Sequence, residues 1–538
     1  MKQMFFGVFL IVTVGVSAVL CGCKSNEDFR RERAENAMKH FEVSRFQHPM
    51  DGKTLTLREC IALAQKNNLE LKAEKLAEQV AREQKTAEML GMLPELNIKN
   101  TLTGRSNTSA SSSKKVGAGG LTYGYSSSTD DNVNVFSTEV ALATLDFGLA
   151  FFNTVQANDR LLMKEQRLRR TSQNLTLDVV KAYFKVASAQ RAINITKKLL
   201  NDCRGRYELI DKLAKKRAIT PFRAFDETRL FINMEKRLTN YIRNYENSCV
   251  ELRALLGMDP SGRIRVDDSC LGVVPRLEFP ELMLMEQIAL LERPELYESD
   301  MRQHIDIVNC RKELIKMIPS ARIFMDFNNS NNSYLYHQSW YSIGINAAFN
   351  LLKLPQHIAT YRAYSDMADA EKTKAYSIGI GIMAQVRISH FNLLTVKERF
   401  AIDDRVYRTY NKNLKWAVAN RRTAGELSKL EIDRMRLETA EKEIERIISL
   451  GNVYVAYFQI LNAMGVSKID ADSIDFLKNE LDAARLRAEG ALARSEAKYN
   501  ARLTENASKD KKEEKKVMNL LSQPLTSSGN ADYISVGQ

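Results

Sequence analysis

The chain contains the same sequence pattern twice, and this duplication constrains the fold more than any other feature. Four pairs of segments match in order, two at an offset of 225 residues and two at offsets of 207 and 208. Two copies of one pattern predict two copies of one structural unit, which we place at residues 55–266 and 280–467. The pairs are NLELKAEKLAEQ (68–79) with RPELYESDMRQH (293–304), GMLPELNI (91–98) with KMIPSARI (316–323), VVKAYFKV (179–186) with VRISHFNLL (386–394), and ALLGM (254–258) with NAMGV (462–466).

The first copy carries an insertion. The offset between the copies falls by about 18 residues between positions 98 and 179, which requires extra residues in the first copy. The Ser/Gly-rich run SNTSASSSKKVGAGGLTYGYSSSTDD occupies residues 106–131 of that interval. This composition predicts a loop between two regular elements.

Each copy opens with a helical pattern that a proline ends. In the first copy we expect one helix over residues 55–92, with Thr56 and Glu59 forming a capping box. Pro94 stops this helix because the residue before a proline is restricted to extended conformations.

Four strands with a period of two follow, two in each copy. We expect them at about 95–105, 133–147, 321–333 and 339–352, with Phe324 breaking one polar side and a possible bulge at Phe136. Each is close to the length that a tilted strand needs to cross a bilayer. Aromatic side chains gather near the strand ends, as in membrane interface belts: Trp340, Tyr334, Tyr336, Phe147, Phe151 and Phe152. Alternation alone also fits two amphipathic hairpins packed on a soluble core.

Each copy ends in a long helical hairpin, expected at 152–257 and 356–463. Residues 152–214 contain no proline and would form a rod of roughly 90 Å, which must pack along equally long partners. Pro221 suits the first turn of the return helix, and Gly425 the corresponding tip of the second copy. An unbroken 4-3 apolar spacing predicts the packing seam: Leu175, Val179, Ala182, Val186, Ala189, Ile193, Thr196, Leu200, Cys203, Tyr207, Ile210 and Ala214.

The N-terminus predicts export. Lys2 precedes an apolar run from Met4 to Leu20, and residues 20–23 read Leu-Cys-Gly-Cys. This pattern resembles a bacterial lipoprotein signal, with 1–22 as the signal peptide, Cys23 as the lipidated residue and 23–54 as a linker. An uncleaved N-terminal helix is the alternative. Export also removes nucleic acid as the leading partner for a chain of net charge +13.

Five scattered cysteines remain beyond the signal, and an odd number argues against a disulfide framework. We expect free thiols at Cys60, Cys203, Cys249, Cys270 and Cys310.

The ordered, duplicated motifs resemble the TolC-like outer-membrane efflux protein family. The matching residues are TLRECIALAQKNNLELKAEKLAEQV followed by LPEL, then LDFG at 145–148, VVKAYF, LLGM and NAMGV. The resemblance implies an α+β membrane protein: a homotrimer with a 12-stranded β-barrel in the outer membrane, continued by a periplasmic α-helical barrel. It also implies a passive, gated exit duct for a tripartite efflux or type I secretion system, docking with a periplasmic adaptor (membrane fusion protein) and an inner-membrane pump.

By the same resemblance, the hairpin tips at 211–222 and 417–428 are the docking sites. The candidate docking residues are Lys212, Lys215, Lys216, Arg217, Arg421 and Arg422, and the candidate gate residues are Asp211 and Glu426. A solvated basic helix end explains these charges equally well.

Residues 468–538 lie outside the family pattern and are expected to form a charged, solvated periplasmic extension with a helix within 477–516.

No catalytic or metal site is expected, because the six histidines make no zinc-ligand spacing and no phosphate-binding glycine loop is present. We therefore expect no cofactor and no enzyme activity. A periplasmic coiled-coil lipoprotein with a structural or adaptor role is the alternative to a transport duct. The sequence does not identify the exported substrate.

Overall fold

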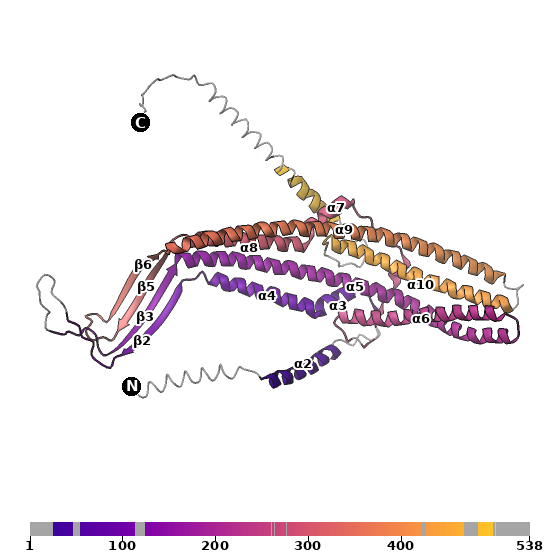
Figure 1. Cartoon of the computed structure of the whole chain (residues 1–538), viewed down its shortest axis with the longest axis horizontal. Coiled ribbons are helices and arrows are strands. Elements are labelled where there is room, and N and C mark those ends of the chain that lie inside the picture. The colour runs from indigo at the N-terminus through magenta and orange to yellow at the C-terminus, as the bar shows by residue number, and fades with distance from the viewer. Residues whose placement is uncertain are drawn as a thin grey trace, which may run out of the picture.

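The computed structural model describes residues 25–46, 54–112, 124–259, 261–262, 264–275, 277–420, 426–466, 482–495, 497–498 and 501. The molecule is elongated, with a four-stranded sheet at one end and helical rods running away from it (Figure 1). Cys23, the signal peptide and the tip residues Arg421, Arg422 and Gly425 lie outside the described residues.

The two copies have the same order of elements. A short and a longer helix lead into two strands, and a very long helix and its return partner follow. The first copy comprises β1 (Thr54–Leu55), α3 (Leu57–Asn67), α4 (Leu69–Leu90), β2 (Glu95–Gly104), β3 (Asn132–Ala143), α5 (Thr144–Lys215) and α6 (Pro221–Leu255). After β4 (Arg265–Val266) and η1 (Ser269–Gly272), the second copy comprises α7 (Leu282–Glu292), α8 (Pro294–Lys316), β5 (Ser320–Ser330), β6 (Ser339–Ala348), η2 (Leu351–Lys353), α9 (Leu354–Ala419) and α10 (Glu426–Ala463).

The single helix expected over 55–92 is two helices that meet at Asn68. The capping box of Thr56 and Glu59 is present, but it starts the 11-residue α3 only. Asn68 then caps α4, because its side-chain oxygen accepts a hydrogen bond from the backbone N–H of Leu71 at 3.0 Å. In the second copy, α7 and α8 meet at Arg293, which is 225 residues later. The break is therefore part of the duplicated unit.

A glycine at the end of each hairpin packs against the break between the two helices that begin the same copy. Gly257 and Gly465 have φ of +68° and +74°, a left-handed conformation that favours glycine. A Cβ at Gly257 would lie 3.1 Å from Asn67 atoms, and one at Gly465 would lie 3.0 Å from the backbone of Glu292. The repeated LLGM and NAMGV motifs thus close each hairpin onto the break that begins its own copy.

The sheet is antiparallel, in the order β2-β3-β5-β6. β3 ends at Ala143, so residues 144–147, which we had expected in the strand, form the first turn of α5 instead. The pairing of β3 with β2 and with β5 is continuous through Phe136, so the possible bulge there is wrong.

The helices form a curved wall in the same order as the strands. Near the sheet, α4, α5, α8 and α9 pack side by side, and in the far half α6, α5, α10 and α9 do so (Figure 1). The seam predicted on α5 is largely interior: Leu175, Val179, Ala182, Val186, Ile193, Thr196 and Ile210 are all buried. Consequently α5 and α9 run the length of the wall, while each shorter helix covers one half of it.

The main core lies near the middle of the helical wall. There, tyrosine hydroxyls donate hydrogen bonds to the segment that connects the two copies. The Tyr183 hydroxyl donates to the Asp267 carbonyl at 2.6 Å, and the Tyr457 hydroxyl donates to the Pro275 carbonyl at 3.1 Å. The Tyr454 ring stacks on Phe184 with centroids 4.8 Å apart, which links α10 to α5. The segment between the two copies is thereby bound to α5 of the first hairpin and to α10 of the second.

The expected solvated C-terminal extension is in part a docked helix. Residues 482–495 are helical, and Ala484 and Ala488 belong to the main core, each 1% exposed. Arg487 Nε lies 2.7 Å from Glu292 Oε1 at the end of α7. This docking could not be predicted from the sequence, because the buried contact residues are alanines among many charges.

α2 (Asn26–Phe46) precedes the duplicated body, and its described side chains, those of residues 26–42, are almost all exposed. Among the described helices, none combines the length and the apolar character needed to cross a bilayer.

Candidate functional site

The sheet has one strongly apolar face. Cross-strand partners share a face, so the register places Leu96, Val140, Met325 and Ile343 in one row. All of these side chains are exposed, and Ile343 reaches 76%. The exposed large apolar side chains on this face are Leu96, Ile98, Leu102, Phe136, Val140, Leu142, Ile323, Met325, Tyr341, Ile343 and Ile345. An exposed apolar face of this extent needs a partner or a lipid environment.

The opposite face is polar and charged. It carries Glu95, Lys99, Glu139, Arg322 and Asp326, as the alternation along each strand requires. Arg322 pairs with Glu139, and its guanidinium carbon lies 5.9 Å from the centroid of the Phe324 ring. This face suits contact with water.

Phe324, which breaks the polar pattern in the sequence, has a packing role. Its ring lies over Gly344 on the neighbouring strand, where a Cβ would come within 2.4 Å of a ring carbon. An aromatic ring that covers a strand glycine shields the backbone there and helps to fix register.

In the part of the chain that the structure describes, both edges of the sheet are open. β2 and β6 each pair on one side only, which leaves a row of backbone donors and acceptors on the other. The helical wall also has apolar outer margins, with Leu76 and Val80 exposed on α4, and Ile380, Ile388 and Phe391 exposed on α9. Open edges and apolar margins on both sides of the wall are what copies arranged in a ring would cover.

Hydrogen bonds join the two loops at the far end of the sheet. The Asn332 side chain donates to the Ser128 carbonyl at 3.0 Å and accepts from the Asp130 N–H at 3.2 Å. The Asp130 carboxylate in turn accepts from the Ser333 N–H at 2.6 Å and hydroxyl at 2.9 Å. This contact fixes the outer end of the sheet across the two copies.

The turn between α5 and α6 forms the described hairpin tip. α5 ends in a Schellman motif, in which the Ala218 N–H donates to the Leu213 carbonyl and Arg217 takes φ 54°. Thr220 then caps α6, and Pro221 occupies its first turn, as the sequence predicted.

The candidate basic residues at this tip are exposed, apart from local pairing. Lys212, Lys215, Lys216 and Arg217 project into solvent, and Lys215 Nζ lies 2.6 Å from Asp211 Oδ2. Asp211 is therefore paired with a lysine of its own helix turn. Glu426 begins α10. The two candidate gate residues thus belong to two different hairpins.

Two aromatic residues at this tip were missed by the sequence reasoning. Phe222 and Phe225 are 84% and 65% exposed and lie three residues apart, on one face of the first turn of α6. Their spacing beside Pro221 was the available signal. A tip with lysines and two bare phenylalanine rings offers both charge and apolar area to a partner.

Ion pairs connect the two hairpins in the far half of the wall. Arg206 on α5 pairs with Asp433 on α10 at 2.9 Å, and Asp433 is only 6% exposed. Arg223 pairs with Glu431 at 2.8 Å, also joining the first hairpin to α10. The Arg206–Asp433 pair is partly buried and helps to hold the hairpins in one relative position, whereas the side chains of Arg223 and Glu431 are largely exposed.

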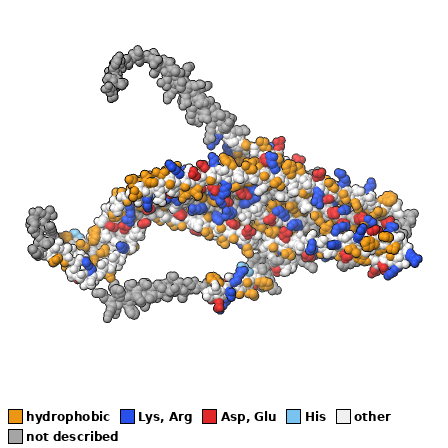
Figure 2. All heavy atoms as spheres, viewed as in Figure 1, with side chains coloured by type: hydrophobic (Ala, Val, Ile, Leu, Met, Phe, Trp, Pro, Cys, Tyr) orange, Lys and Arg blue, Asp and Glu red, His pale blue; other side chains and the backbone are white. Residues whose placement is uncertain are grey.

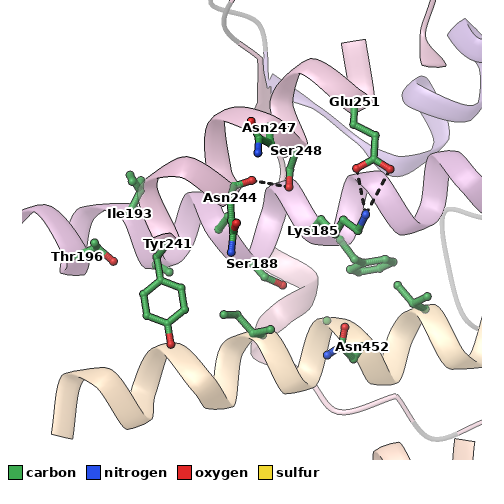
Figure 3. A pocket seen from close by; sticks show the side chains of 16 residues that line it. Lys185, Ser188, Ile193, Thr196, Tyr241, Asn244, Asn247, Ser248, Glu251 and Asn452 are labelled. Atoms are coloured by element: carbon green, nitrogen blue, oxygen red, sulfur yellow. Dashed lines mark hydrogen bonds and ion pairs between the residues drawn. The ribbon is translucent and has the colours of Figure 1, made fainter. Parts of the chain in front are cut away.

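A groove of about 370 Å³ lies between the two hairpins, closer to the middle of the helical wall, and is lined by α5, α6 and α10 (Figure 3). Lys185 and Glu251 form an ion pair at one end, with Nζ 3.0 Å from Oε2. Burial, followed by the nearby Glu445 and Glu441, raises the pKa of Tyr241 to about 12, so its hydroxyl stays protonated. The groove offers hydroxyls and amides rather than a set of paired carboxylates.

Charged side chains cover the helical body on the face seen in Figure 2, with Lys and Arg interspersed with Asp and Glu. Among the described residues, no group of three or more His, Cys, Asp or Glu side chains is arranged to hold a metal ion. The described cysteines Cys60, Cys249, Cys270 and Cys310 are free thiols. The Cys203 side chain lies outside the described residues.

The sequence profile of the outer membrane efflux protein family matches residues 60–258, within the first copy. The outer-membrane channel OprN has a TM-score of 0.58 at 14% identity, over 77% of this chain and 91% of that chain. The open state of MtrE from Neisseria gonorrhoeae has a TM-score of 0.60 at 14% identity, over 76% of this chain and 88% of that chain. CmeC from Campylobacter jejuni has a TM-score of 0.59 at 13% identity, over 82% of this chain and 94% of that chain. Comparison with curated protein sequences finds no match.

Proposed function

We propose that the chain is a TolC-like outer membrane efflux protein and that it forms the outer-membrane exit duct of a tripartite efflux or type I secretion system. One observation carries the proposal: a sheet with one apolar face and two open edges continues, strand by strand, into a wall of long helices. Backbone groups at an open edge cannot remain unpaired in lipid. A sheet of this kind becomes stable in a membrane only when copies close it.

The closed assembly is a homotrimer with a 12-stranded barrel in the outer membrane. The β2 edge of one copy pairs with the β6 edge of the next, and the α4 and α6 margin packs on the α9 margin of its neighbour. The apolar sheet face then contacts lipid and the polar face lines the lumen. This arrangement covers the exposed apolar side chains of both wall margins.

Lipidation at Cys23 supplements the barrel as an anchor on the periplasmic side. Its support is the Leu-Cys-Gly-Cys sequence at residues 20–23, and α2 begins only three residues after Cys23. A single lipidated residue is a modest tether, so the barrel carries most of the membrane attachment.

Transport through the duct is passive, with energy from an inner-membrane pump and docking through a periplasmic adaptor. We place docking at the hairpin tips, through Lys212, Lys215, Lys216 and Arg217, with Arg421 and Arg422 in the second copy, and the gate near Asp211 and Glu426. The exposed Phe222 and Phe225 add apolar area to this surface. Asp211 also pairs with Lys215 in the same helix turn, as an exposed ion pair.

Reconstitution tests the duct. The full-length protein, extracted with detergent from outer membranes, should run as a trimer after cross-linking and should give single-channel conductance in planar bilayers. A Cys23→Ser variant carrying a cleavable export signal should remain in the outer membrane. Release of that variant into the soluble periplasmic fraction, with no conductance from the wild type, would instead indicate a coiled-coil lipoprotein.

Charge reversal tests the docking surface. Lys215→Glu combined with Lys216→Glu should weaken cross-linking to the adaptor while the trimer and its conductance persist. Lys198→Glu, on the exposed side of α5 and 17 residues before Lys215, is the matched control and should change nothing. Equal cross-linking by all three proteins would remove these lysines from the docking surface.

A further inference from the structure

One row of the polar sheet face contains two carboxylates. Glu139 lies directly opposite Asp326 across the β3–β5 pair, and the same row continues to Asn97 on β2 and Ser342 on β6. Like charges directly opposite in a sheet repel each other and destabilise the pair. The row therefore holds a negative charge that packing alone does not favour.

Only one of the two carboxylates has a counter-charge. Arg322 pairs with Glu139 and is held there by the Phe324 ring, which itself covers Gly344. Among the described residues, Asp326 takes part in no ion pair, and its buried Oδ1 has no hydrogen-bond partner. Lys99 sits one row farther out, opposite Ser137. Asp326 is thus the carboxylate of this row that has no counter-charge among the described residues.

The charges of the whole face do not cancel either. Glu95, Glu139 and Asp326 oppose Lys99 and Arg322, which leaves one net negative charge in each chain. In a ring of copies, the same row would repeat around the lumen. Clefts with low-dielectric walls concentrate the field of such charges, and rings of Asp or Glu favour cations.

We propose that Asp326 is a selectivity residue of the duct, giving the barrel lumen a preference for cationic over anionic solutes of otherwise similar size. This inference rests on the proposed function, because it requires the polar face to line a closed pore. Arg322 is its counterpart, since it removes Glu139 from the same field. Cationic or neutral cargo passes this row more readily than anionic cargo.

Reversal potentials in planar bilayers test the proposal. In a KCl gradient, Asp326→Asn should lower the ratio of potassium to chloride permeability relative to the wild type. Lys99→Gln, one row away on the same face and in no described ion pair, should raise the same ratio. Arg322→Gln, which frees Glu139, should also raise it. The comparison uses shifts from the wild type, so the basic tip affects all the proteins equally.

The outcomes separate the inference from the proposed function. Channels that open normally but show the same permeability ratio in wild type, Asp326→Asn and Lys99→Gln would overturn the selectivity role and leave the duct intact. Absence of any conductance from the wild type would overturn the duct itself. Because Asp326→Asn keeps the side-chain shape and Lys99→Gln breaks no pair, opposite shifts from these two variants would support the inference even if Arg322→Gln failed to assemble.

Discussion

Gly257 and Gly465 each allow the end of a hairpin to pack closely against the start of the same copy. Both have left-handed backbone conformations, and both lie against the break between the two short helices that begin their own copy. A side chain would strain the backbone and also press on backbone atoms of the break.

We expect Gly465→Ala and Gly257→Ala each to lower the free energy of unfolding by about 1–3 kcal/mol. Gly205→Ala is the control, because a Cβ at this position in α5 meets nothing within 4 Å and alanine favours a helix. Thermal unfolding of the detergent-extracted protein measures all three. A loss at Gly205 as large as that at Gly465 would contradict the role of the left-handed backbone.

The α8 helix illustrates pH dependence at the scale of one element. Glu313 on α8 accepts a hydrogen bond from Lys316 Nζ at 2.7 Å and lies 2.8 Å from Nδ1 of His357 on α9. Burial acts to raise the pKa of Glu313, but the hydrogen bonds and charges of Lys316 and His357 outweigh it and hold the pKa below its ordinary value of 4.5. The ionised carboxylate therefore helps to hold α8 on α9.

A carboxyl whose pKa is depressed on folding contributes stability above its unfolded pKa and loses it as the pH falls through its folded pKa. Glu313→Gln should therefore lower the melting temperature at pH 7, and its difference from the wild type should shrink below about pH 4.5. Melting curves across this pH range check the prediction. A difference of constant size at pH 7 and at pH 4 would show that the carboxylate charge is not responsible.

The docking of the C-terminal helix, residues 482–495, depends on a small buried side chain. Ala488 is buried against the main core, whereas Leu486, two residues earlier, is 69% exposed. Ala488→Gln inserts a larger polar side chain into a filled contact, which typically costs about 1–3 kcal/mol. We expect Ala488→Gln to be cleaved faster by protease within residues 482–495. Mass spectrometry of the fragments measures the cleavage rate. Leu486→Gln should leave the cleavage rate unchanged, and equal rates in the two variants would mean that the helix does not depend on this contact.

In the proposed duct, the apolar face of the sheet meets lipid and the polar face lines the lumen. Ile343 and Ser342 are neighbours on β6 but lie on the apolar and the polar face respectively. A lysine near the middle of the lipid-facing surface costs about 2–4 kcal/mol. Ile343→Lys should therefore reduce the fraction of protein recovered as outer-membrane trimer, while Ser342→Lys should not. Trimer recovery after cross-linking is the measurement, and a larger loss for Ser342→Lys would reverse the assignment of the two faces.

Much of the architecture could be predicted because it repeats over short distances in the chain. The duplication, the period of two after Pro94 and the 4-3 spacing along α5 are local signals, and each corresponds to an element of the structure. The tip charges could also be listed from the sequence, and the spacing of four residues between Asp211 and Lys215 is a local helical pair. The pairing of Arg223 with Glu431 could not be predicted, because it depends on how the two hairpins pack. The position of Phe324 over Gly344 depends on strand register, which local alternation leaves open.

Local patterns in the sequence are enough to count the copies, to order the elements in each, and to give every strand an apolar and a polar side. The fold is needed to show which strands are neighbours, which carboxylates face each other, and where the C-terminal helix packs. The physical reason is range. Periodicity reflects the geometry of adjacent residues, whereas the pairs of Glu139 with Asp326 and of Arg206 with Asp433 join segments that are far apart in the chain.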